Sequence, residues 1–364
     1  MIIIFLSVVS FVLALTHFVI YKVIISLFSF SSVERIIIGI ILTILCLSFI
    51  IASILTFNFN NSFTRIFYIT SASWLGFAFY LFLFSCIYIL TLEMLRLFGV
   101  NISLKWFGIL CLIIAIIIGI YGLIHARYIN IKNINVALPN LPVSWQGKKA
   151  VWISDLHLGV IYDTNFTQNI VNKINEINPD IVFIGGDLYD GTKVDEIDIV
   201  KPFTGLHPAL GTYFITGNHE EFRNNKVYLN AISSTGIHIL DNEMIIIDGV
   251  QIIGVNDKDS TNVAEFNIIL SSLNIDKSKP IILLKHQPFQ LAQAAQAGIS
   301  FQISGHTHQA QMFPLNIFTN LIYKGYDYGF HKVDKMDVFT SNGVGTWGPP
   351  MRVGNNAEIV VFNF

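Results

Sequence analysis

The hydrophobic pattern of the chain changes near residue 126, from long unbroken apolar runs to short alternating ones. The apolar runs cover residues 2–21, 36–57, 67–92 and 106–126. A helix of about 20 apolar residues crosses the roughly 30 Å hydrocarbon core of a bilayer. The runs lack the alternating polarity of a membrane β-strand. We therefore predict a membrane domain with four transmembrane helices at residues 1–126 and a water-soluble domain at 127–364.

Charge follows the same division. Residues 1–126 contain only seven charged side chains, whereas the remainder has 17 Lys and Arg and 22 Asp and Glu. This mildly acidic balance argues against a nucleic-acid partner, which would require a basic face. The three cysteines, Cys46, Cys86 and Cys111, all lie in apolar runs, so a disulfide framework is excluded for the water-soluble domain.

The orientation in the membrane follows from basic residues in short loops. Four basic residues fall on one side and three on the other: Lys22, Arg35, Arg96 and Lys105, against Arg65, Arg127 and Lys132. No basic segment precedes the first run, so we expect it to be kept as a helix rather than cleaved as a signal peptide. We expect a multi-pass protein of the cell membrane with its water-soluble domain on the extracytoplasmic side.

After residue 126, strand-like and helix-like patterns alternate. Buried or alternating runs predict strands near 128–137, 149–154, 181–184, 213–216, 237–240, 243–247, 251–255, 281–285 and 301–304. Helical spacing appears at 165–177 and 262–273, and shortly after residue 220. We expect Asp241 and Asn242 to form a hairpin turn between the two short strands beside them. The alternation predicts an α/β layered domain with its site at the carboxyl ends of the strands.

Five polar clusters follow five of these strands directly. They are Asp155-Leu156-His157, Gly186-Asp187, Gly217-Asn218-His219-Glu220, His286, and Gly305-His306-Thr307-His308. Residues two apart at a strand end project to the same side, so each Asp-x-His or His-x-His pair can bind one ion. A mixture of carboxylate, amide and imidazole ligands suits Mn, Fe or Zn better than Ca. Each cluster alone has an ordinary structural interpretation as a turn, but the ordered set predicts a metal site.

This ordered set resembles that of the calcineurin-like metallophosphoesterase superfamily, across residues 149–364. The His306-Thr307-His308-Gln309 segment and the late glycine-rich stretch from Gly343 to Pro350, with Arg352, resemble its membrane-anchored bacterial branch. Ala310 stands where that branch would have glycine, and the late stretch is as compatible with a structural turn as with a substrate contact. The resemblance implies a four-layer α/β/β/α sandwich with a dinuclear metal centre.

The resemblance also assigns roles to the residues. It implies that a first divalent ion binds Asp155, His157, Asp187 and His308, and a second Asp187, Asn218, His286 and His306. Asp187 would bridge the two ions, and a bridging hydroxide would attack the phosphorus atom. His219 would protonate the leaving oxygen or stabilise charge, and Glu220 would orient the His219 ring.

The expected function is therefore a membrane-anchored phosphoesterase that hydrolyses phosphodiester or pyrophosphate bonds, with lipid-linked substrates included. Residues 312–328 are rich in apolar side chains, which either pack on the rest of the protein or meet the bilayer and admit a lipid-borne phosphate. The alternatives are a hydrolase of lipid-linked nucleotide pyrophosphates and a non-catalytic membrane scaffold or sensor. A transporter has less support, because the apolar runs contain few ionisable residues.

Overall fold

The computed structural model describes residues 2–222 and 225–364. It divides into two compact units, each described here by itself. The first holds the residues up to His125 together with Gly348–Met351. The second holds Ala126–Trp347 and Arg352–Phe364.

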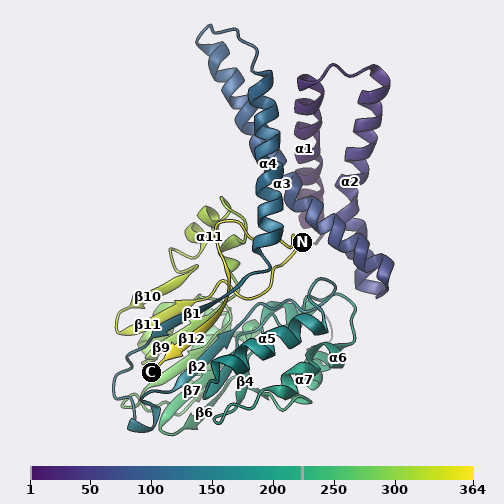
Figure 1. The fold of residues 1–364 in the computed structure, drawn as a ribbon. Helices are drawn as coiled ribbons and strands as arrows, with labels where there is room; N and C mark the ends of the chain where they lie inside the picture. The colour runs from purple at the N-terminus through teal and green to yellow at the C-terminus, as the bar shows by residue number, and fades with distance from the viewer. Residues whose placement is uncertain (1, 223–224) are drawn as a thin grey trace. The chain divides into compact units, whose positions relative to one another are not determined.

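The first unit is helical. Its helices are α1 (Ile2–Leu27), α2 (Ser32–Asn58), α3 (Ser62–Leu97) and α4 (Lys105–His125) (Figure 1). Among the described residues, these four are long and apolar enough to cross a membrane, which confirms the predicted number of long apolar helices.

Small residues explain how the helices approach one another. The buried face of α4 consists of small side chains, Gly108, Cys111, Ala115, Gly119 and Gly122. A Cβ atom added at Gly119 would collide with the Phe77 ring of α3. Small residues at this spacing allow two helices to pack closely where burial of apolar surface provides little driving force in lipid.

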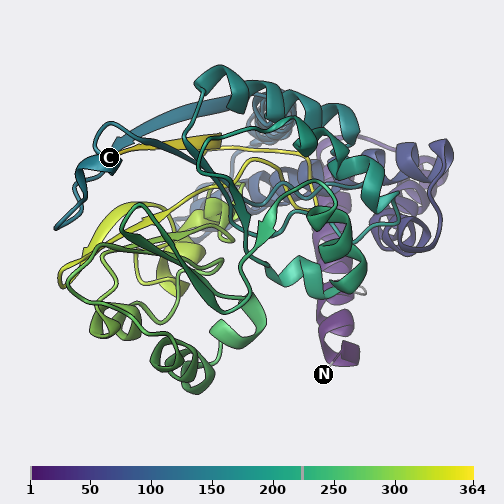
Figure 2. The same cartoon turned by 90° about the horizontal axis from the view of Figure 1, so that it is seen from below.

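The second unit contains two six-stranded sheets (Figures 1 and 2). The first sheet has the order β1 (Ile129–Asn135), β12 (Ala357–Asn363), β2 (Lys149–Ile153), β3 (Ile181–Ile184), β4 (Thr212–Phe214) and β5 (His238–Ile239). The second sheet has the order β10 (Gly329–Val333), β11 (Met336–Thr340), β9 (Phe301–Ser304), β8 (Ile281–Leu284), β7 (Val250–Gly254) and β6 (Glu243–Ile247). The strands from β2 to β5 run parallel, as do β7, β8, β9 and β11.

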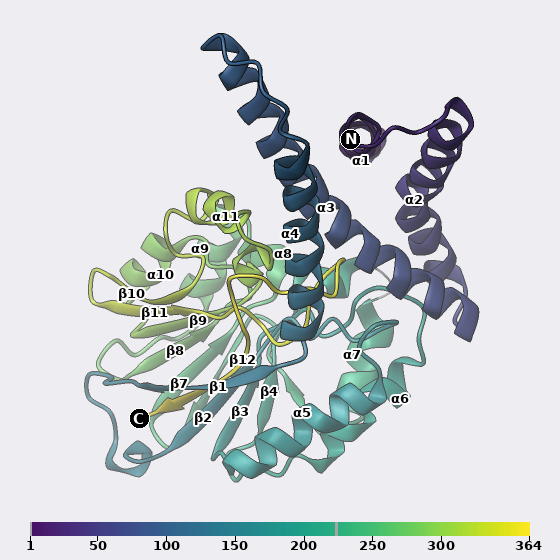
Figure 3. The same cartoon turned by 45° about the horizontal axis from the view of Figure 1, so that its top comes forward.

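Three apolar cores separate four layers. Large buried side chains such as Trp152 and Phe183 fill the space between the two sheets. Helices α5 (Thr164–Ile177), α6 (Glu196–Val200) and α7 (Asn225–Ser233) cover the outer face of the first sheet. Helices α9 (Val263–Ser272) and α10 (Leu291–Ala297) cover the outer face of the second (Figure 3). The α/β/β/α architecture is thus confirmed.

The expected hairpin around Asp241 and Asn242 is wrong. Strand β5 pairs with β4 in the first sheet, whereas β6 pairs with β7 in the second, so the chain crosses between sheets at these residues. The hairpin lies one connection later, between β6 and β7, where Asp248 and Gly249 both have positive φ. Such a two-residue turn matches the twist of antiparallel strands. Alternating polarity identifies a strand but does not identify its partner.

A candidate metal centre where five strands end

The predicted polar clusters lie at the carboxyl ends of strands in both sheets. The first three clusters follow β2, β3 and β4 of the first sheet, and the last two follow β8 and β9 of the second. Because these strands are parallel within each sheet, their carboxyl ends lie along one edge. Side chains that are up to 153 positions apart in the sequence, Asp155 and His308, therefore meet.

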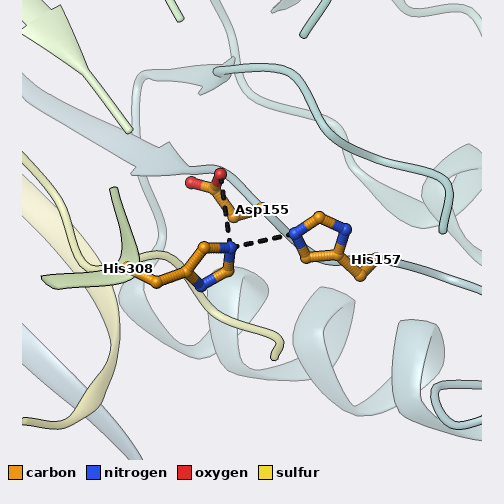
Figure 4. A group of neighbouring side chains, drawn as sticks. All are labelled: Asp155, His157 and His308. Atoms are coloured by element: carbon orange, nitrogen blue, oxygen red, sulfur yellow. Dashed lines mark hydrogen bonds and ion pairs between the residues drawn. The ribbon is translucent and has the colours of Figure 1, made fainter. Parts of the chain in front are cut away.

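Asp155, His157 and His308 form one group (Figure 4). The Nε2 atoms of the two histidines lie 2.9 Å apart, and the Nε2 atom of His308 lies 3.7 Å from Oδ1 of Asp155. All three side chains point toward one another and are buried. One carboxylate and two imidazoles are a common ligand set for a borderline divalent metal ion.

Asp187, His286 and His306 form a second group. The Nε2 atom of His286 lies 3.2 Å from Oδ2 of Asp187 and 3.2 Å from Nδ1 of His306. The other ring nitrogen of His286, Nδ1, lies 2.8 Å from the Gly185 carbonyl oxygen and donates its proton there. This outer hydrogen bond fixes the ring and leaves Nε2 to face the group, as is usual for a metal-binding histidine.

Asp187 also belongs to a third group, with His157 and His219. Within each group, one ligand atom per residue lies within 4.8 Å of the others. The carboxylate of Asp187 thus belongs to two of the three groups. A ligand shared by two ions would have such a double membership.

The residues fit metal ions on two observations. First, nitrogen lone pairs and carboxylate oxygens face one another, and a cation between them would remove the electrostatic repulsion among these atoms. Second, the Oδ1 atom of Asn218 is buried without a hydrogen-bond partner. Buried polar atoms nearly always have a partner, so this carbonyl oxygen suits a metal ligand.

The backbone is strained at these positions. Asp155, His157, Asp187, His306 and His308 all have positive φ, between 48° and 71°. A residue with a Cβ atom costs about 1 kcal/mol or more in this region. Such strain concentrates at functional sites, where the surrounding structure holds it in place.

Close approach of the loops requires glycine at two positions. A Cβ atom at Gly217 would collide with the Asp187 carboxylate, and one at Gly305 would collide with Asp155 and Ser154. These glycines allow the loops after β4 and β9 to pack directly against the acidic residues that follow β3 and β2.

Burial lowers the pKa of three imidazoles of the site, whereas at His286 burial is outweighed by the Asp187 carboxylate, which raises the pKa. Burial lowers the pKa of His157 well below its usual range, with repulsion from His219 as the next cause. Burial and the neighbouring His286 lower the pKa of His306 to about 3. His308 shifts in the same direction, through burial and His157. Neutral imidazoles keep the lone pairs that metal ions bind.

Glu220 has partners other than the expected one. Its Oε2 atom accepts hydrogen bonds from the backbone N–H groups of Asp187 (3.0 Å) and Gly217 (2.6 Å). Its Oε1 atom accepts from those of Leu188 (2.9 Å) and Tyr189 (3.3 Å). The contacts described for this carboxylate therefore join two ligand-bearing loops, whereas the sequence analysis assigned it to orienting the His219 ring.

His219 is held from two directions. Its backbone N–H donates to Oδ1 of Asp187 at 2.8 Å, and its ring Nδ1 lies 3.3 Å from the Asp190 carbonyl oxygen. The ring also meets Trp347 edge-on, with centroids 5.7 Å apart. Trp347 is 56% exposed, so this indole adjoins both the site and solvent.

Arg352 supports the loop beside the metal centre, a role that the pattern of metal ligands did not predict. Arg352 is fully buried, and its guanidinium donates to the carbonyl oxygens of Asn342 (2.8 Å), Gly343 (3.2 Å) and Gly345 (2.6 Å). The same nitrogen lies 3.5 Å from Nδ1 of His308. The sequence signal was the glycine-rich stretch with Arg352, which supports the structural interpretation for Gly343 and Gly345.

Comparison with known proteins agrees with this geometry. A sequence model of the calcineurin-like phosphoesterase family matches residues 148–310. An uncharacterised metallophosphoesterase of Campylobacter jejuni is 30% identical over 269 residues, which cover 72% of this chain and 71% of that protein. The chain belongs to the calcineurin-like metallophosphoesterase family.

Two other relatives are named as transmembrane proteins that contain a metallophosphoesterase domain. A transmembrane protein with a metallophosphoesterase domain from Danio rerio is 32% identical over 270 residues, covering 69% of this metallophosphoesterase and 61% of the relative. A second protein of that name, from Bos taurus, is also 32% identical, over 69% of this chain and 60% of its own. The chain thus spans about three fifths of the length of these two relatives. Family membership and the grouped His and Asp residues indicate a metallophosphoesterase domain with side chains placed to bind metal.

Proposed function

We propose that this metallophosphoesterase is a membrane-anchored, dinuclear enzyme that hydrolyses phosphodiester or pyrophosphate bonds. The observation that carries the proposal is that Asp187 belongs to two of the three groups that could bind a metal ion. One ion is assigned to Asp155, His157, Asp187 and His308. The other is assigned to Asp187, Asn218, His286 and His306.

Two divalent ions, when bound, supply an acidified water molecule and positive charge that stabilises a phosphate in its transition state. The remaining steps belong to side chains of the chain itself. The ring of His219 donates Nδ1–H to the Asp190 carbonyl oxygen, which leaves Nε2 for the substrate. When the ring is protonated to the imidazolium, Nε2–H donates its proton to the leaving oxygen and favours departure of the alcohol.

Glu220 contributes to the reaction by holding other residues in place. With four backbone N–H donors on its carboxylate, it fixes the loops that present Asp187 and Asn218. Misplacement of a ligand by about 1 Å costs about a hundredfold in rate. Glu220 is therefore a positioning residue, distinct from His219.

The membrane side is part of the proposal. Lys22, Arg35, Arg96 and Lys105 outnumber the basic residues of the opposite side, and basic loops stay in the cytoplasm. This bias favours a catalytic domain outside the cytoplasm. A reporter fused after Phe364 that is active only in the cytoplasm would contradict this orientation.

The test of the activity uses the purified full chain in detergent. We expect Mn²⁺-dependent release of nitrophenol from bis(p-nitrophenyl) phosphate, slower release from p-nitrophenyl phosphate, and loss of both with EDTA. Two bound equivalents of metal without turnover of diester, pyrophosphate or monoester would instead favour the scaffold or sensor.

A further inference from the structure

Helix α11 (Asn316–Ile322) has an apolar surface that nothing in its own unit covers. None of its residues is buried. Its apolar side chains Ile317, Phe318, Leu321 and Ile322 are 53–70% exposed, and Phe313 just before it is 53% exposed. Exposed apolar side chains that are contiguous mark interaction sites more often than isolated ones do.

Helix α11 also borders a pocket of about 230 Å³ that mixes polar and apolar side chains. Six residues line it: Gln309, Asn316, Ile317, Asn320, Leu321 and Asp327. The Oδ1 atom of Asn316 is buried and has no hydrogen-bond partner. Both oxygens of Asp327 are already used, by Thr319 and by Asn320, each at 3.0 Å. The pocket therefore offers an unused acceptor and lacks a cation among its six lining residues.

This pocket adjoins the loop that carries two proposed metal ligands. Gln309, in its lining, directly follows His308. Thr307 donates its hydroxyl to the Asp327 carbonyl oxygen at 2.6 Å. Tyr323, at the end of α11, lies edge-on to the His306 ring, with centroids 6.2 Å apart. A group bound in the pocket is thus a near neighbour of the metal centre.

The covalent connection between the apolar helices and the second unit is short. Helix α4 ends at His125 and β1 begins at Ile129. Lys132 of β1 donates to the Tyr328 hydroxyl at 2.8 Å, and Tyr328 follows α11 by six residues. The chain from His125 to Lys132 spans at most about 25 Å. A tether of this length permits α11 to reach a bilayer that α4 crosses.

We propose that α11 enters the interfacial layer of the bilayer and that the pocket beneath it binds the headgroup of a phosphodiester lipid. The scissile phosphate then lies at the metal centre. A water oxygen forms a bond to phosphorus, one P–O ester bond breaks, and the leaving oxygen takes up a proton. The proposal rests on the proposed function and names its substrate class.

The chemistry of the pocket selects the headgroup. The free Oδ1 of Asn316 requires a hydrogen-bond donor, and the carboxylate of Asp327 opposes a second anion. A hydroxyl or an ammonium group supplies the donor. Phosphatidylglycerol and phosphatidylethanolamine carry these two groups, whereas phosphatidylmethanol carries neither in its headgroup.

The first test compares two substrates for one variant. The full chain is reconstituted with Mn²⁺, and hydrolysis of phosphatidylglycerol vesicles is measured beside that of soluble bis(p-nitrophenyl) phosphate. Removing two apolar side chains from an interfacial contact weakens it by about tenfold or more. We expect the Phe318→Ser, Leu321→Ser variant to lose about that much more activity on vesicles than on the soluble diester.

A matched control uses exposed apolar residues elsewhere on the domain. Ile197 and Ile246 are 62% and 59% exposed and lie on α6 and β6. The Ile197→Ser, Ile246→Ser variant should retain the wild-type ratio of the two activities. Equal losses on both substrates in the α11 variant would overturn the inference. Absence of turnover of either substrate by the wild type would instead refute the proposed function.

The second test addresses the pocket. Asn316→Leu keeps the size of the side chain and removes the acceptor. We expect it to lower kcat/KM for phosphatidylglycerol and phosphatidylethanolamine by about tenfold, and to change that for phosphatidylmethanol much less. If the wild type prefers one of the two lipids with a donor headgroup, that headgroup is the one that the pocket binds. A uniform loss on all three lipids would overturn the assignment of the pocket to the headgroup.

Discussion

The Nε2 atoms of His157 and His308 lie 2.9 Å apart, although the two residues are separated by 151 positions in the chain. Each histidine belongs to a different sheet loop, and both rings are buried and neutral. Two such nitrogens can share a proton or a cation. The Asp155 carboxylate beside them favours a cation, because it brings negative charge into a buried site.

Asp187→Asn should remove metal from both halves of the centre. The change keeps the shape of the side chain but withdraws the negative charge that two ions would share. We expect diesterase activity to fall by more than about a hundredfold, since even outer partners of a metal site cost 10–100-fold. Metal content by mass spectrometry should fall below two equivalents. The control is Asp180→Asn, which changes a carboxylate that pairs with Lys148 away from the centre. This variant should retain its activity and its metal content. Full metal content in Asp187→Asn would contradict the bridging role.

His219→Asn should separate catalysis from metal binding. His219 is assigned to the leaving oxygen, so its loss removes a proton donor that is worth about 10²–10⁴ in rate. We expect kcat to fall within that range while two equivalents of metal remain bound. A useful comparison is a substrate with a nitrophenolate leaving group, which needs little protonation and should suffer least. If the variant loses its metal, His219 is a ligand and the proposed role is wrong.

Residue pattern predicted the layers and the strand ends well, for a physical reason. Buried parallel strands such as β3 and β8 have sequences that are short apolar runs. The metal-binding candidates come directly after such runs in the sequence. The positions of Asp187 and His286 are therefore visible in the sequence. The pairing of β5 and β6 is not, because alternation does not record which sheet a strand joins.

The supports of the site were harder to predict. Glu220 has the same neighbours in sequence whether it meets an imidazole or four backbone amides. The amides belong to Gly217 and to the loop from Asp187 to Tyr189, which only the packing of β3 against β4 brings within reach. Ser154, whose hydroxyl donates to the Asp155 carboxylate, likewise carries no signal beyond an ordinary strand residue.

Glu220→Gln should destabilise the domain and weaken metal binding together. The amide turns one acceptor oxygen into a donor that faces backbone N–H groups. Each buried N–H group that loses its acceptor costs about 1–3 kcal/mol, so we expect the free energy of unfolding to fall by about 2 kcal/mol. Glu221, the exposed neighbour, offers a matched control as Glu221→Gln. An unchanged melting temperature with reduced kcat would return Glu220 to the role of orienting His219.

Arg352→Lys should loosen the loop that packs on the metal centre. A lysine keeps the charge but cannot donate to three carbonyl oxygens spread over Asn342, Gly343 and Gly345 from one planar group. Leaving buried acceptors unpaired costs about 1–3 kcal/mol each, so the melting temperature should fall by several degrees. Arg127→Lys, at an exposed position, should leave it unchanged. Because Arg352 also approaches His308, titration with Mn²⁺ should show a lower affinity at one of the two proposed metal sites. If the affinities of both sites are unchanged, Arg352 only holds the loop in place.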